Sequence, residues 1–203
     1  MSGTAVDYSR LEPGFAEPVH NAQACFRAVL NAMAHPGHIE RMPLTLAGAP
    51  PAPLGIAAAA IALTLCDFDT PVWLDPASRG AAPYLTFHCG APLTDTPGEA
   101  RFAFVADMVA LPPLIEFALG TDEYPERSTT LVIEVARLTE GEGVELTGPG
   151  LREAVRLDVA GLPARFWTER AAVAELFPRG IDVMFVSGDR VAALPRSTRI
   201  SLS

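Results

Sequence analysis

Apolar residues recur at steps of three and four between residues 18 and 35. The positions are Ala22, Cys25, Phe26, Val29, Leu30 and Met33. This spacing places them on one side of an amphipathic helix. Pro36-Gly37 ends the helix, because proline cannot continue the hydrogen-bond ladder and glycine accepts the exit conformation. A second helix over residues 54–66 is apolar on nearly every side, so we expect it to be buried.

Short segments rich in β-branched and aromatic residues, bounded by proline, glycine and aspartate, predict the strands. They cover residues 71–74, 84–87, 101–105, 128–135, 144–147 and 181–186. A short helix over residues 114–119 and an amphipathic helix over residues 162–177 lie between them. Helices that alternate with short strands indicate one α/β domain over residues 1–203, with a mixed sheet flanked by helices in three layers.

The composition is that of a folded domain. Of 203 residues, 49% are hydrophobic and 19% are charged, which is the reverse of a disordered chain. The longest apolar run, over residues 54–66, is shorter than the ~20 residues that cross a bilayer. The first residues carry Asp7, Arg10 and Glu12 and show no basic-then-apolar leader. We therefore expect a cytoplasmic protein that does not bind a membrane.

Charge and cysteine content disfavour further classes of protein. The net charge of −9 disfavours nucleic-acid binding, which needs clustered cations. Cys25, Cys66 and Cys89 are odd in number and widely spaced, so we interpret them as reduced, buried thiols. No CxxC pair occurs, which disfavours a zinc or iron–sulfur site made by this chain alone. We expect no bound metal.

The basic residues are all arginines: the chain has 15 of them and no lysine. A pyridoxal-phosphate enzyme needs a lysine amine for its internal Schiff base. A phosphate-binding loop of the GK[ST] type needs its lysine in the same way. The sequence therefore excludes both classes, and we expect no cofactor.

Three short motifs have a chemical and a structural interpretation. His35 and His38 flank a Pro-Gly turn, but two imidazoles do not make a metal site, and a role at the helix end is simpler. Asp67 and Asp69 offer oxygen ligands for magnesium, although turn chemistry, which we favour, explains them as well. Gly148-Pro149-Gly150 either offers backbone amides to an anion or forms a tight turn, which we favour.

The C-terminal residues Arg196, Ser197, Thr198 and Arg199 follow the last predicted strand. Arginine beside hydroxyl groups suits phosphate binding. Arginine is also favoured at protein interfaces, and the residues alone do not separate the two interpretations. No nucleophile–base signature, dinucleotide-binding glycine motif or zinc-protease motif occurs in the chain.

Several short sequence motifs follow one another along nearly the whole chain. They are Cys25-Phe26-Arg27, residues 33–37, residues 62–73, Gly120-Thr121, residues 148–150, residues 177–182 and residues 193–198. No single motif is specific to one protein family. As an ordered set, the motifs are similar to those of PhnH proteins from bacterial phosphonate-degradation operons.

The resemblance implies a fold similar to the large domain of pyridoxal-phosphate-dependent transferases, without the cofactor. It also implies a homodimer that joins the G, I and J subunits in the carbon–phosphorus lyase core complex. That complex attaches a phosphonate to the ribose of a nucleoside triphosphate and displaces the base. The resemblance further implies that the I subunit carries this base-displacement chemistry.

Two roles are consistent with this resemblance. The first is an assembly subunit with no complete active site of its own. The second is an enzyme subunit that binds the triphosphate or the phosphonate through Arg196, Arg199 and the Gly148-Pro149-Gly150 turn. A free-standing transfer enzyme has no motif in its support.

Overall fold

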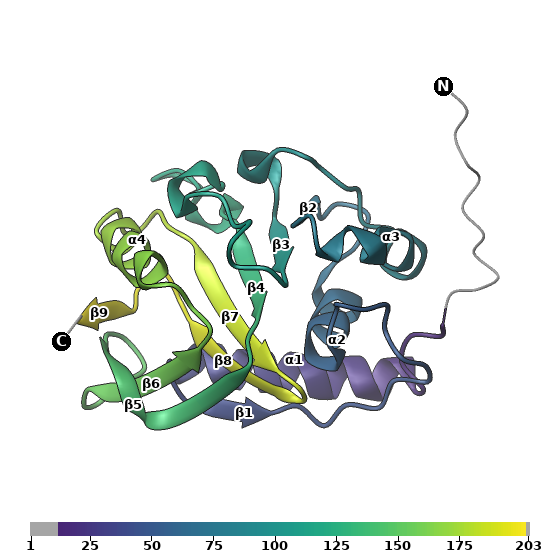
Figure 1. Ribbon diagram of the computed structural model, residues 1–203, viewed down its shortest axis with the longest axis horizontal. Coiled ribbons are helices and arrows are strands. Elements are labelled where there is room, and N and C mark those ends of the chain that lie inside the picture. Colours follow the sequence, from purple (N-terminus) through teal and green to yellow (C-terminus); the bar gives the residue numbers. More distant parts are fainter. Residues whose placement is uncertain (1–11, 202–203) are drawn as a thin grey trace.

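The computed structural model describes residues 12–201, which form four α-helices and nine strands (Figure 1). Asp7 and Arg10, on which the prediction about the leader depends, lie outside this range. Within the range, no helix is long and apolar enough to cross a membrane.

Six strands form the central sheet, in the order β1-β8-β7-β4-β3-β2. Their bounds are β1 Ile39–Arg41, β2 Val72–Leu74, β3 Phe102–Val105, β4 Thr130–Glu134, β7 Asp182–Ser187 and β8 Arg190–Leu194. The neighbouring strands β2, β3, β4 and β7 pair in parallel. β8 pairs antiparallel with both β7 and β1. The predicted mixed sheet is therefore confirmed. β4 and β7 lie inside the sheet with both faces covered, which explains their unbroken apolar runs.

The two faces of this sheet are covered differently (Figure 1). The helices α1 (Pro18–Ala34), α2 (Ile56–Leu65) and α3 (Ala82–Cys89) pack on one face. The other face carries α4 (Ala164–Ala174) and a second sheet in the order β6-β5-β9. The strands of that sheet are β5 Arg137–Thr147, β6 Val155–Ala160 and β9 Arg199–Ser201. Three layers are present as predicted, but one of them contains this small sheet, which the sequence did not indicate.

The strands of the central sheet supply both cores by alternating their side chains. On β4, Val132 packs beneath α1, α2 and α3, whereas Leu131 and Ile133 pack against α4 and the small sheet. α2 is buried along most of its length, from Ala57 to Ala62, as its apolar sequence predicts. Its alanines allow the helix to lie close against its neighbours.

α1 buries a narrower face than its apolar stripe. Ala28 and Ala32 face the core, together with Cys25 and Val29. Phe26 and Leu30, which belong to the same stripe in the sequence, are about half exposed. The helix is confirmed, but its larger apolar residues remain at the surface because smaller ones fill the contact with the sheet.

Residues 84–87, predicted as a strand, belong to the helix α3, so this prediction is wrong. Pro83 lies in the first turn of the helix, where its missing N–H costs nothing. Gly90 ends it in the left-handed conformation, with φ of 68°. Tyr84 and Leu85 are buried on one side. The flanking proline and glycine, together with this burial, override the strand preference of Tyr, Thr and Phe.

Other differences arise where polar residues interrupt the strands. β5 extends well before the predicted residues 144–147, and its pairing with β6 shifts register between Glu140 and Val144. Glycines at 141 and 143 with positive φ produce this irregularity and hide the strand signal. β1, β6, β8 and β9 were not predicted either. The predicted short helix over residues 114–119 is only one 3-10 turn, Leu114–Glu116.

Candidate functional site

Arg196 lies in the turn between β8 and β9, and its side chain is committed to the fold. Its Nη2 lies 2.5 Å from Oδ2 of Asp182, at the start of β7. Its Nε and backbone N–H donate to Oδ1 of the same carboxylate, at 3.3 and 2.7 Å. Its Nη1 donates to the carbonyl oxygen of Pro125. Only 17% of the Arg196 side chain is exposed, so the residue connects three segments and has little capacity for a ligand.

A second arginine, Arg170 on α4, is completely buried beside this pair. Its Nη2 donates to the carbonyl oxygen of Pro195 at 2.6 Å. Its Nε and Nη1 have no hydrogen-bond partner among the described residues. Burial lowers the pKa of Arg170 to about 10, and the charge of Arg196 acts in the same direction, while Asp182 opposes it. Two guanidinium groups therefore share one carboxylate in a region of low dielectric constant.

Ser197 and Arg199 line a cavity of about 440 Å³ between the end of α4 and the turn after β5. Gly148 lies on the same cavity, together with Glu175 and Phe177. A Cβ atom at Gly148 would lie 2.9 Å from the carbonyl oxygen of Ser197, so glycine permits the two segments to approach. The structure thus brings together three of the predicted residues. Glu175 adds a negative charge to the cavity that Arg199 lines, which weakens the cavity's attraction for an anion.

Gly150 and Thr198 are not among the residues that line this cavity, and their contacts belong to the fold. Gly150 adopts φ of 88°, and a Cβ atom there would lie 2.3 Å from the carbonyl oxygen of Ala34. The N–H of Leu151 donates to the carbonyl oxygen of Gly148, which closes the tight turn favoured from the sequence. Thr198 is fully buried, and its hydroxyl has no hydrogen-bond partner among the described residues.

Asp67 and Asp69 lie far along the sheet from this cavity, in the turn before β2 at its edge. Oδ1 of Asp67 accepts the hydroxyl of Thr70 at 2.6 Å and the N–H of Asp69 at 3.0 Å. These hydrogen bonds, that of Thr70 above all, lower the pKa of Asp67. The arrangement is the turn chemistry favoured from the sequence. Among residues 12–201, no three His, Cys, Asp or Glu side chains are placed to hold a metal ion.

The histidines after α1 have separate contacts. Nδ1 of His35 lies 3.0 Å from the carbonyl oxygen of Asn31, in the last turns of the helix. Nδ1 of His38 lies 3.7 Å from Oε1 of Glu140. The two rings meet edge to face with centroids 6.2 Å apart. His35 therefore contacts the end of α1, as expected from the sequence, whereas His38 lies beside Glu140 on the distant strand β5.

The three cysteines are free thiols, and all of them are wholly or partly buried. Burial raises the pKa of Cys25 and of Cys89 to about 11, and it raises that of Cys66 further. Thiols with raised pKa values are poor nucleophiles at neutral pH. The interpretation of these cysteines as buried thiols is confirmed.

With this geometry in place, the comparison with known proteins gives the family. The sequence model described as "Bacterial phosphonate metabolism protein (PhnH)" matches residues 13–201. The chain belongs to the PhnH family. It is 50% identical over 188 residues to the "Alpha-D-ribose 1-methylphosphonate 5-triphosphate synthase subunit PhnH" of Rhizobium meliloti (strain 1021), covering 92% of this chain and 93% of that protein.

A second relative covers less of the chain. The "Putative C-P lyase subunit protein HtxG" of Stutzerimonas stutzeri is 43% identical over 84 residues, which is 41% of this chain and 43% of that protein. The PhnH match includes both sheets, the cavity beside Arg199 and the Arg170–Asp182–Arg196 cluster. The resemblance to PhnH proteins, inferred from short sequence motifs, is therefore confirmed at the level of the family.

Sequence reasoning did not single out Arg170, which is fully buried, or Glu134, which is half-buried. Arg170 occupies the buried face of α4 between Phe166 and Val173, so an arginine within an apolar stripe was the available signal. Glu134 ends β4, and its Oε1 accepts the N–H of Gly55 at 2.6 Å, just before α2. Burial raises the pKa of Glu134. Both residues hold elements together, Arg170 through the carbonyl oxygen of Pro195 and Glu134 through the N–H of Gly55.

Proposed function

We propose that this chain is a subunit of the carbon–phosphorus lyase core complex. The complex would form ribose 1-phosphonate 5-triphosphate from a nucleoside triphosphate and an alkylphosphonate, with displacement of the base, in phosphonate catabolism. The observation that carries the proposal is the 50% identity, over 92% of the chain, to a protein named as a subunit of alpha-D-ribose 1-methylphosphonate 5-triphosphate synthase.

We assign the chain an assembly role, without a complete active site of its own. Two observations support this assignment. Arg196, one of the two arginines that the sequence offers for phosphate binding, is bound to Asp182 and to the carbonyl oxygen of Pro125. The cysteines have raised pKa values and are wholly or partly buried. A subunit of this kind contributes surfaces and shape to a site that another chain completes.

The remaining features of the proposal come from the family resemblance. The partners are the G, I and J subunits, and the isolated chain is a cytoplasmic homodimer. The fold is that of the large domain of pyridoxal-phosphate-dependent transferases. No pyridoxal phosphate is bound, because the chain contains no lysine to form the imine.

One observation favours a second candidate function, in which the chain binds the nucleotide or the phosphonate directly. Ser197, Arg199 and Gly148 meet around one cavity, where a guanidinium and a hydroxyl lie within reach of the same ligand. In this version Arg199 binds the phosphate, and Arg196 only supports the turn.

Titration of the isolated protein with a nucleoside triphosphate separates the two versions. The assembly role predicts no binding below the millimolar range. A micromolar Kd, which corresponds to roughly −8 kcal/mol, would support direct nucleotide binding and contradict the assembly role. Light scattering in the same buffer should give about twice the chain mass of 21.5 kDa. A clean monomer would contradict the homodimer.

A further inference from the structure

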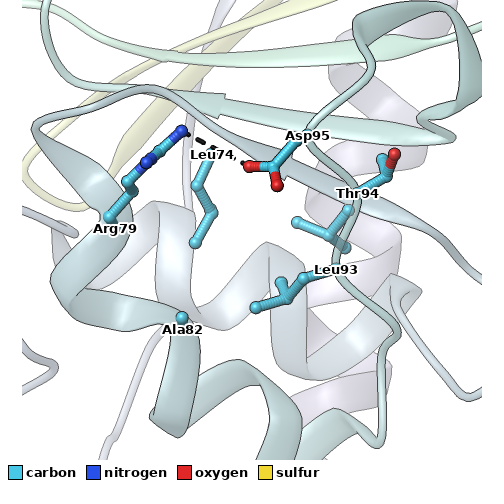
Figure 2. A pocket seen from close by; sticks show the side chains of 7 residues that line it. Leu74, Arg79, Ala82, Leu93, Thr94 and Asp95 are labelled. Carbon is cyan, nitrogen blue, oxygen red and sulfur yellow. Dashed lines mark hydrogen bonds and ion pairs between the residues drawn. The ribbon is translucent and has the colours of Figure 1, made fainter. Parts of the chain in front are cut away.

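A cavity of about 270 Å³ opens beside β2, the edge strand of the central sheet (Figure 2). Val72, Leu74, Ala82 and Leu93 give it apolar walls. Figure 2 shows Arg79 and Asp95 facing each other across it, and their Nη2 and Oδ1 atoms lie 3.3 Å apart. Both side chains are mostly exposed, so this ion pair contributes little to stability and can exchange partners.

Large apolar side chains lie exposed around this cavity. Leu93, which forms part of its wall, is 45% exposed. Phe68 is 74% exposed, and its Cβ lies 3.8 Å from where a Cβ at Gly90 would stand, at the end of α3. Leu93 lies three residues after Gly90 and forms a parallel β-bridge with Val72. Val72 in turn lies four residues after Phe68. An open apolar cavity with exposed apolar neighbours is typical of a protein interaction site.

The charges of this region determine what it can accept. Four exposed acidic residues lie on the segments that lead into β2 or continue from the cavity: Asp67, Asp69, Asp95 and Glu99. One exposed arginine, Arg79, accompanies them, and Arg101 at the start of β3 is half-buried. A second copy of this chain, joined through the same surface by a twofold axis, would bring together two surfaces that each carry a net negative charge. The surface therefore fits a different chain with cationic side chains.

We propose that the β2-edge surface, made of Phe68, Asp69, Arg79, Leu93 and Asp95, is the docking site for another subunit of the complex. The partner inserts an aliphatic or aromatic side chain between Leu74 and Leu93, and it places lysine or arginine side chains against Asp69 and Asp95. This inference rests on the proposed function, which supplies the partner chains.

Binding of purified variants to an immobilised complex of the G, I and J subunits tests this proposal. Leu93→Arg blocks the cavity and adds a cation, and the paired change Asp69→Arg with Asp95→Arg reverses the local charge. Each variant should bind at least tenfold more weakly than the wild type. The wild-type affinity should fall as salt rises, because the contact depends on opposite charges. Unchanged melting temperatures will establish that the variants remain folded.

Leu30→Arg on α1 is the matched control, since Leu30 is 57% exposed and α1 packs mainly on α2, β8 and β1, the strand at the opposite edge of the sheet from β2. It should bind within about twofold of the wild type, the change expected of a residue outside the contact. Wild-type affinity in both β2-edge variants would overturn the proposal, as would an equal loss in Leu30→Arg. Conversion of a dimer to a monomer by Leu93→Arg, with unchanged binding to the other subunits, would assign the surface to self-association instead. No binding by the wild type would refute the proposed function itself, and this docking site with it.

Discussion

Replacing Asp182 by asparagine tests the interpretation of the buried charge cluster. The carboxylate pairs with Arg196 through both oxygens and lies beside the fully buried Arg170. Asparagine keeps the shape of the side chain but removes the charge that offsets two guanidinium groups. Removing one member of a buried ion pair costs ~3–5 kcal/mol. Because 13% of the Asp182 side chain is exposed, we expect a value near the lower end, ~3 kcal/mol.

Urea unfolding, followed by far-UV circular dichroism and by the fluorescence of Trp73 and Trp167, measures this loss. With an m-value of ~2 kcal/mol per M, the midpoint should fall by ~1.5 M. Asp158→Asn is the matched control, because Asp158 pairs with Arg137 at 3.5 Å on the surface. That change should cost no more than ~0.5 kcal/mol.

The cluster also predicts that the effects of Asp182→Asn and Arg170→Met on stability are coupled. In the Asp182→Asn background, Arg170 and Arg196 repel each other without a carboxylate between them. Arg170→Met removes one charge and nearly preserves the side-chain volume, so it should restore part of the lost stability. A midpoint for Asp182→Asn that equals the wild-type value would refute this reasoning. An Arg170→Met change that simply adds its own loss would refute it as well.

Three further changes test other parts of the structure. In thermal unfolding, Gly150→Ala should lower the free energy of unfolding by at least ~2 kcal/mol, since its Cβ would meet the carbonyl oxygen of Ala34. The control Gly161→Ala, which has a positive φ but open space around it, should cost only ~1 kcal/mol. Glu134 has a raised pKa, so the folded state favours its protonated form; the wild type should therefore lose stability relative to Glu134→Gln as pH rises from the ordinary glutamate pKa through the raised value, and a pH-independent difference would contradict this. Arg199→Ala should leave turnover of the assembled complex unchanged under the assembly role, whereas loss of turnover with normal assembly would support the second candidate function.

The elements that the sequence predicts correctly are those whose residues are buried on every side or on one clear face. α2 and the central strands β4 and β7 have continuous apolar sequences, because both faces of the sheet are covered. Residues 84–87 were mistaken for a strand because Tyr, Thr and Phe favour strands, while Pro83 and Gly90 determine the helix ends. Local preference was weaker there than the flanking residues and the packing.

The candidate site could be predicted only in part. Gly148, Ser197 and Arg199, three of the predicted residues, line one cavity because β9 pairs with β5. That pairing joins residues more than 50 positions apart, which no local pattern contains. Arg196 was singled out for its charge, but its commitment to Asp182 depends on the antiparallel pairing of β7 with β8. The β2-edge surface depends likewise on where the end of α3 meets the turn before β2.

The most direct test of the central claim is reconstitution of the complex from purified G, I and J subunits with and without this chain. Release of the free base from a nucleoside triphosphate in the presence of methylphosphonate measures the reaction. Our account predicts that this chain co-elutes with the complex, that the complete complex releases base, and that neither this chain alone nor the complex without it does so at a comparable rate. Base release by the isolated chain, or an undiminished rate in its absence, would contradict the account.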